Sequence, residues 1–104
     1  MKVVQIGVKH GNVNTVDIDG SLKSLQEIVG GYIEPCAPFQ LKVMGIEMLC
    51  NEEGLLKGLD PNENLYPFFF VGPCIMLGFN GENFTSLTNI QINFIHDWLK
   101  FDQK

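Results

Sequence analysis

The chain has 104 residues, of which 45% are apolar, and this size and composition suit one globular domain with its own core. It carries twelve acidic residues, seven lysines and no arginine, so its formal net charge is −5. An acidic chain without arginine lacks the basic surface that nucleic acids require, which argues against direct DNA or RNA binding. No segment reaches the roughly 20 apolar residues of a membrane span, so we expect no membrane insertion.

Three cysteines, Cys36, Cys50 and Cys74, are widely spaced along the chain, without a C-x-x-C motif or a cysteine–histidine ligand pattern. We therefore expect buried free thiols in a reducing compartment, no metal site and no cofactor. The N-terminal residues lack the apolar core of a signal peptide, which predicts a cytosolic protein in the cell that makes it.

The first third of the chain predicts two strands, a helix and a further short strand. Apolar and polar residues alternate over residues 2–8 and 13–18, which are separated by a hairpin turn. Ser21 is a suitable N-cap for a helix over residues 21–30, in which apolar residues recur at helical spacing. A short strand is expected over residues 32–34.

The middle of the chain predicts strands and connecting loops. Residues 36–39 are expected to form a loop, and residues 41–50 a strand with a bulge. Leu55–Leu56 is expected to continue as a returning strand. The most apolar segment, residues 68–79, predicts one buried strand or two strands divided at Gly72–Pro73.

The last quarter of the chain predicts a hairpin and a terminal helix. Asn80–Gly81 is a strong hairpin-turn signal, and Thr88 with Gln91 forms a capping box for a helix over residues 88–101. This order of elements predicts an α+β fold, with a mainly antiparallel sheet packed against two helices. We expect a single domain over residues 1–104.

Three parts of the chain resemble, in order and spacing, a domain-of-unknown-function family of small proteins from bacteriophages, plasmids and conjugative elements of Gram-positive bacteria. They are Ile18–Leu22 running to Val29–Glu34, then Cys50–Gly54 with Gly58–Asn62, and finally Phe84–Thr88. The chain reads Pro61-Asn62-Glu63 where that family usually has Pro-Asn-Arg. The resemblance implies no activity. It implies a setting among accessory genes of mobile elements, often in conflict with host defence.

The longest polar connection, residues 51–66, is the predicted binding loop, because long loops of fixed chemistry often carry function. Asparagine amides can bind a polar ligand, but asparagine is also an ordinary turn residue, and the adjacent glutamates also suit a solvated turn. Both interpretations remain open at this stage. The candidate ligand or partner contacts are Asn51, Glu52, Glu53, Asn62, Asn64 and Tyr66.

Aromatic residues supply the candidate subunit interface. Three consecutive aromatic residues, Phe68–Phe70, cannot all face one side of a strand, so Phe69 is expected at an interface, together with Trp98 and Phe101 of the terminal helix. A core position is the alternative for each. The number of apolar positions exceeds what one small core readily covers, so we expect a homo-oligomer.

No motif in the sequence supports catalysis, and neither His10 nor His96 has a suitable partner nearby in the sequence. We therefore expect a non-enzymatic protein, located in the bacterial host cytoplasm. The first hypothesis is sequestration of a small polar ligand, such as a nucleotide-derived defence signal, by a homo-oligomer. The alternative is a protein-binding inhibitor of a host defence factor.

Overall fold

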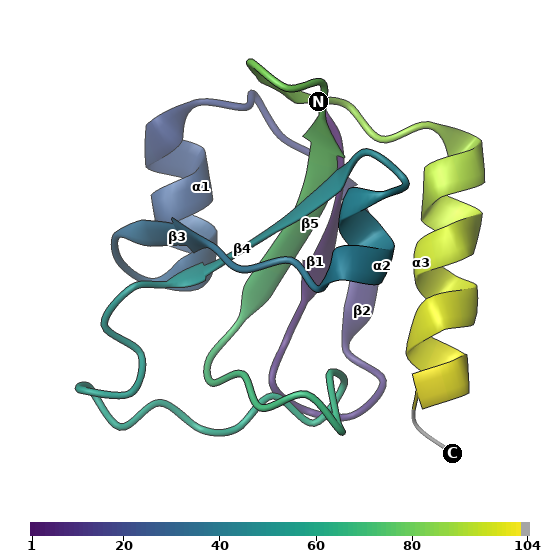
Figure 1. Cartoon of the computed structure of the whole chain (residues 1–104). Coiled ribbons are helices and arrows are strands. Elements are labelled where there is room, and N and C mark those ends of the chain that lie inside the picture. The colour runs from purple at the N-terminus through teal and green to yellow at the C-terminus, as the bar shows by residue number, and fades with distance from the viewer. Residues whose placement is uncertain (103–104) are drawn as a thin grey trace.

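The computed structural model describes the backbone of residues 1–102 and the side chains of residues 1–100. In this part of the chain, six strands form one sheet and three helices accompany it (Figure 1). The strands are β1 (Lys2–Ile6), β2 (Val13–Asp17), β3 (Ile33–Pro35), β4 (Ile46–Asn51), β5 (Cys74–Phe79) and β6 (Phe84–Thr85). The helices are α1 (Leu22–Val29), α2 (Phe39–Lys42) and α3 (Asn89–Asp102).

All strand pairs of the sheet are antiparallel. The strand order is β2-β1-β5-β4-β3, and β6 pairs with β5. β5 is the central strand, since its Met76 lies opposite Val4 of β1 and opposite Met48 of β4. The predicted α+β class with an antiparallel sheet is therefore confirmed.

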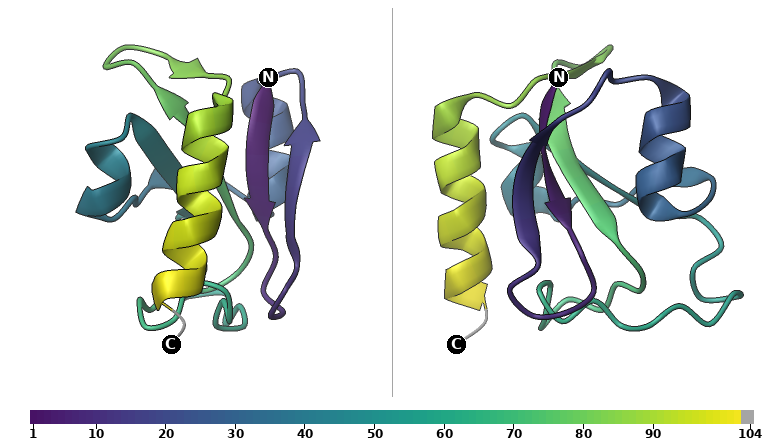
Figure 2. Two further views of the ribbon diagram at one scale, coloured as in Figure 1. Left: turned by 90° about the vertical axis from the view of Figure 1, so that its right-hand side faces the viewer. Right: turned by 180° about the vertical axis from the view of Figure 1, so that it is seen from behind.

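Helices cover both faces of the sheet (Figure 2). On one face, α1 packs Leu25 and Val29 against side chains of β1, β4 and β5. On the other face, Leu41 of α2 and Ile95 of α3 belong to a second, larger core cluster. β5 is consequently buried on both faces from Cys74 to Gly78, and a strand buried in this way has a continuous apolar sequence without alternation.

The two predicted helices begin at the expected capping residues. α1 follows Ser21, whose hydroxyl accepts the N–H of Ser24 at 3.1 Å, and it ends at Gly30, where φ is 80°. α3 follows the predicted capping box. The N–H of Gln91 donates to the Thr88 hydroxyl at 3.2 Å, and the N–H of Thr88 donates to the Gln91 side-chain oxygen at 3.0 Å.

A third helix, α2, lies where the sequence predicts the end of a loop and the start of a strand. Pro38, whose fixed φ suits the start of a helix, precedes α2 directly. Gly45 then takes a φ of 71°, a conformation that favours glycine, and β4 starts only at Ile46. The prediction of a strand beginning at residue 41 is wrong, and so is the prediction of only two helices.

Two further predicted strands do not form. Leu55–Leu56 lies in a series of turns, where the N–H of Lys57 donates to the carbonyl of Glu53 at 2.9 Å. Residues 68–73 form bends and irregular backbone with one isolated bridge from Val71 to Pro61, and β5 starts only at Cys74, directly after a proline that cannot donate to the sheet. Apolar composition alone therefore predicts strands wrongly in both segments, because apolar residues also occur in loops.

Asp19 supports the start of α1 and provides a test of its cap. Its carboxylate accepts hydrogen bonds from the Ser24 hydroxyl at 2.6 Å and from the N–H of Ser21 at 2.8 Å. These bonds favour the charged form and lower the pKa of Asp19 from 3.8 to about 2. Because the folded-state pKa is lowered, the stabilisation is present above the ordinary pKa and is lost as the pH falls toward the lowered value.

We therefore expect Asp19→Ala to lower the melting temperature near neutral pH, and this difference from the wild type to shrink as the pH falls from 3.8 to about 2. Thermal denaturation followed by circular dichroism across this range measures the effect. Asp17→Ala, at an exposed position of β2, is the control. A difference that is independent of pH would contradict the role of the carboxylate.

Candidate functional site

The predicted binding loop, residues 51–66, lies in the connection between β4 and β5 at one end of the sheet. The whole connection, residues 52–73, is called the loop from here on, and it forms the lower edge of the molecule in Figure 1. Two backbone hydrogen bonds join its outgoing and returning limbs: Asn62 N–H to the Phe70 carbonyl at 2.8 Å, and Gly72 N–H to the Asp60 carbonyl at 2.7 Å. The loop is thus a defined hydrogen-bonded structure, although it contains no regular strand pair.

Asn62 holds the loop together from inside. Its side chain is only 3% exposed. The Nδ2 group donates to the carbonyls of Gly72 at 2.9 Å and Ile6 at 3.3 Å, and Oδ1 accepts the N–H of Asn64 at 3.1 Å. One amide therefore connects both limbs of the loop to the end of β1.

Asn64 connects the loop to the hairpin between β1 and β2. Its Nδ2 group donates to the carbonyls of Gly7 and Lys9, both at 2.8 Å, and its Oδ1 accepts the N–H of Gly11 at 2.8 Å. This buried amide satisfies three backbone groups of a turn, which is a structural role.

Asn51 has a similar role at the other end of the loop. Its Nδ2 group donates to the carbonyl of Val29 at the end of α1 at 3.2 Å, and its Oδ1 accepts the N–H of Glu53 at 2.8 Å. All three asparagines are buried, which corrects the expectation of exposed turn residues at these positions. Their amide groups already bind backbone groups of this chain.

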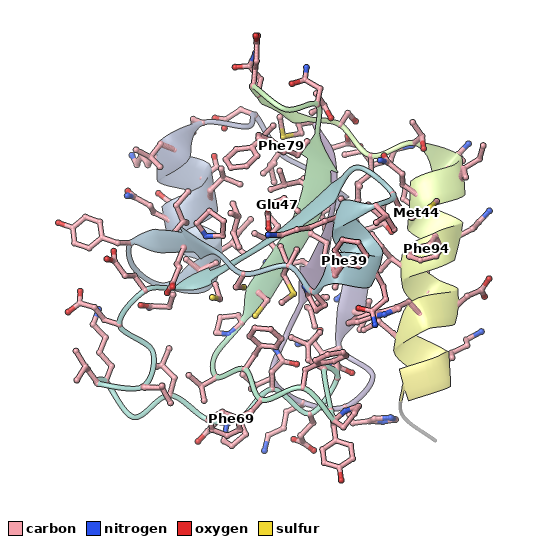
Figure 3. All side chains as sticks on the ribbon, viewed as in Figure 1. Phe39, Met44, Glu47, Phe69, Phe79 and Phe94 are labelled. Atoms are coloured by element: carbon pink, nitrogen blue, oxygen red, sulfur yellow. The ribbon has the colours of Figure 1, made fainter. Side chains whose placement is uncertain are left out.

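Apolar side chains take the outward positions of the same loop. Leu56 is 87% exposed and Phe69 is 71% exposed, and Leu55 and Tyr66 are similarly accessible. Phe69 extends from the lower edge of the molecule in Figure 3. We call the surface made by Leu55, Leu56, Tyr66 and Phe69 the loop face.

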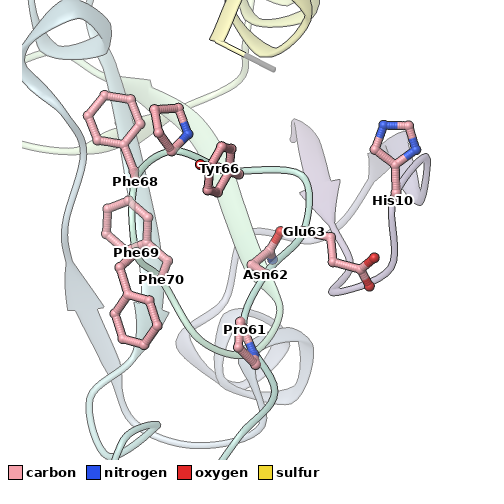
Figure 4. A pocket seen from close by; sticks show the side chains of 9 residues that line it. His10, Pro61, Asn62, Glu63, Tyr66, Phe68, Phe69 and Phe70 are labelled. Carbon is pink, nitrogen blue, oxygen red and sulfur yellow. The ribbon is translucent and has the colours of Figure 1, made fainter. Parts of the chain in front are cut away.

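The first of two hollows lies beside Tyr66 and Phe69 and has a volume of about 520 Å³ (Figure 4). Aromatic and proline rings form most of its wall, with a carboxylate from Glu63 and an imidazole from His10. The lining residues are His10, Pro61, Asn62, Glu63, Tyr66, Pro67, Phe68, Phe69 and Phe70.

The second hollow has a volume of about 430 Å³ and adjoins the first, since Phe69 and Phe70 line both. It includes the leucines of the loop face, two cysteines and two acidic residues. The remaining lining residues are Glu34, Cys36, Cys50, Asn51, Glu52, Gly54, Leu55, Leu56 and Val71.

The charged groups that line the two hollows are acidic. Glu63 belongs to the first hollow, and Glu34 and Glu52 belong to the second. Lys9 contacts one of these carboxylates on the exposed surface, where its Nζ lies 3.9 Å from Glu63. The walls of the hollows are therefore mainly apolar, with carboxylates beside the apolar side chains. Such walls suit an apolar or cationic ligand group better than a phosphate.

The other predicted site residues lie in different environments. Glu52 is exposed and lines the second hollow, whereas Glu53 is half-buried. Trp98 is only 8% exposed and stacks on Phe68 with ring centroids 5.5 Å apart, so it takes the core position that was the alternative to an interface. The side chain of Phe101 lies outside the described residues.

Leu55, Leu56 and Phe70 were not among the predicted site residues, although the structure places them in the site. The sequence does carry a signal for the leucines, because two adjacent large apolar residues stand between turn residues. Within the described residues, no cluster of three or more metal-binding side chains is present. No helix in that part of the chain is long and apolar enough to span a membrane.

These features define a small α+β protein whose β4–β5 loop has an internal asparagine scaffold and an apolar outer face. The chain belongs to the family described as domain of unknown function DUF3846, whose sequence model matches residues 1–100. No curated protein and no solved structure is similar enough to the chain to be matched with it.

Proposed function

We propose that this protein is a non-enzymatic binding protein that recognises another protein through the loop face. The observation that supports this proposal is the inverted arrangement of the loop. Its asparagine amides are directed inward to the backbone, whereas Leu56 and Phe69 are exposed. Large exposed apolar side chains that lie together are typical of a surface that a partner covers.

Burial of the exposed apolar side chains of the loop face against a partner would lower the free energy. Complete burial of a leucine or phenylalanine side chain contributes about 1.5–3 kcal/mol, so the loop face could supply several such contributions to binding. The scaffold of Asn62 and Asn64 holds the backbone in place before binding, and a preorganised surface loses less conformational entropy in the complex.

The proposed setting follows from the resemblance to proteins of phages, plasmids and conjugative elements. We propose that the protein acts in the cytoplasm of a bacterial host and inhibits a host defence factor by occupying part of its surface. A binding protein needs no catalytic group for such an effect, because inhibition results from occupancy alone.

The experiment is affinity purification of the full chain from a bacterial host with an active defence system, followed by calorimetry with the co-purified protein. We expect the double variant Leu56→Ser/Phe69→Ser to bind at least about tenfold more weakly than the wild type. Leu22→Ser is the matched control, because Leu22 is 58% exposed on α1, outside the loop face. Equal affinity of all three proteins would contradict the proposal.

A small ligand in the first hollow is the second candidate function. The volume of about 520 Å³ lies in the usual range for small-molecule sites, and aromatic rings can stack on a planar base. The Glu63 carboxylate can accept a hydrogen bond from an amino group of such a base. We propose this site for the base of a nucleotide-derived signal. A rise in Tm with nucleosides or cyclic nucleotides, lost in Glu63→Gln, would support it.

Self-association is a further part of the proposal. α2 and α3 cover the same face of the sheet, and Phe39 of α2, Val43 directly after it and Ile90 of α3 are exposed. Contact between these residues in two copies would bury apolar surface outside the loop face. Sedimentation velocity at tens of micromolar protein tests this assembly, and a monomer that persists at such concentrations would contradict it.

A further inference from the structure

The three cysteines, which are far apart in the sequence, come together on one face of the sheet. Met48 and Cys50 alternate with Leu49 along β4, so they point to the same face. The N–H of Cys36 donates to the carbonyl of Met48 at 2.8 Å, which continues the pairing of Pro35 with Leu49 beyond the end of β3. Cys36 and Cys50 thus occupy diagonal positions on neighbouring segments of that face.

Cys74 lies on the other side of Cys50. The pairing of Leu49 with Ile75 continues by one residue to place Cys50 opposite Cys74, the first residue of β5. Cys74 is fully buried, and this burial raises the pKa of its thiol to about 12. Cys36 and Cys50 are half-buried and line the second hollow, so a small reagent can reach them.

The accessible thiols differ in acidity. The hydrogen bond between the two side chains lowers the pKa of Cys50 and raises the pKa of Cys36, which burial raises further. The direction of these shifts makes Cys50 the more acidic thiol of the pair, with the thiol of Cys36 beside it. A thiolate next to a second thiol is the arrangement that favours sulfenic acid formation followed by disulfide closure.

We propose that Cys36 and Cys50 form a reversible oxidation site in the wall of the second hollow, where a peroxide converts the two thiols into a disulfide. The Cys50 thiolate attacks one oxygen of hydrogen peroxide, the O–O bond breaks, and the leaving hydroxide takes a proton to become water. The resulting Cys50 sulfenic acid is attacked by the Cys36 sulfur. The S–S bond forms as the S–O bond breaks, and the hydroxyl group leaves with the Cys36 proton as a second water.

In this reaction the two thiols lose two electrons and the peroxide gains them. A dithiol reductant reverses it by thiol–disulfide exchange. The proposal does not depend on the identity of any partner of the loop face. It concerns a pair of residues whose chemistry can be measured on the isolated protein.

The experiment treats the reduced full chain with equimolar hydrogen peroxide and then titrates thiols and maps disulfides by mass spectrometry without reduction. We expect the titrated thiols of the unfolded protein to fall from three to one, with Cys36 linked to Cys50. Dithiothreitol should restore all three. Cys74→Ala should keep the link, whereas Cys36→Ser and Cys50→Ser should lose it.

Circular dichroism of each variant controls for folding, and the mapping of the wild-type protein tests the proposal even if a variant fails to fold. Three outcomes with the wild type would overturn it. They are a link between Cys50 and Cys74, three thiols that remain reduced, and oxidation of Cys50 to sulfinic acid without any link to Cys36.

Discussion

Replacement of Trp98 by alanine should lower the free energy of unfolding by about 3–5 kcal/mol, the range for removal of a large aromatic side chain from a core. Trp98 is 8% exposed and belongs to the core cluster between the sheet and α3. The substitution also removes the stacking on Phe68. Part of the lost stability therefore comes from weaker packing of the β4–β5 loop, which contains Phe68. Urea denaturation, analysed with a two-state model, measures the change.

The control for this prediction is Ile90→Ala on the same helix. Ile90 is 74% exposed, so the substitution should change the free energy of unfolding by less than about 1 kcal/mol. If Trp98→Ala has an effect as small as that of the control, the indole does not contribute to the core. In that case Trp98 would be a contact residue.

Replacement of Asn62 by alanine should cost about 2–5 kcal/mol, because buried backbone groups lose their hydrogen-bond partner. Three of these groups are affected: the carbonyls of Ile6 and Gly72 and the N–H of Asn64. From the sequence alone, where Asn62 is expected to be an exposed turn residue, only a modest decrease in the free energy of unfolding is predicted. Thermal and urea denaturation distinguish the two expectations.

Glu63→Ala is the matched control for Asn62→Ala, because it alters the adjacent residue on the solvent side of the same turn. Glu63 forms an exposed ion pair with Lys9, and such pairs contribute at most about 1 kcal/mol. An Asn62→Ala protein as stable as Glu63→Ala would exclude the scaffold role. A binding loss for Glu63→Ala at unchanged stability would identify the first hollow as a ligand site.

The elements that the sequence predicts well are those with a local chemical signal. Ser21 and Thr88 identify the starts of α1 and α3, because capping requires a particular side chain at a particular position. α2 has no capping hydrogen bond from a side chain, and the sequence predicts a loop where it starts. The sequence also predicts a strand before Gly72–Pro73 that does not form, because buried strands and partly buried loops can share an apolar composition.

The candidate site was only partly predictable, because its contacts are long-range. The sequence identifies the loop, but it cannot distinguish an asparagine that binds a ligand from one that binds the chain's own backbone. The bonds of Asn62 to Ile6 and of Asn64 to Gly7 join residues from distant parts of the sequence. The convergence of Cys36 and Cys50 is equally invisible in sequence, since it depends on the register between β3 and β4.

The bonds from Asn62 and Asn64 to the end of β1 also link the shape of the loop to the end of the sheet. The carbonyls of Ile6, Gly7 and Lys9 accept these bonds, so the loop cannot open without releasing them. Each buried carbonyl that loses its hydrogen-bond partner costs about 1–3 kcal/mol, and this cost opposes local opening of the loop. The loop face therefore keeps its shape for as long as the end of β1 keeps its place in the sheet.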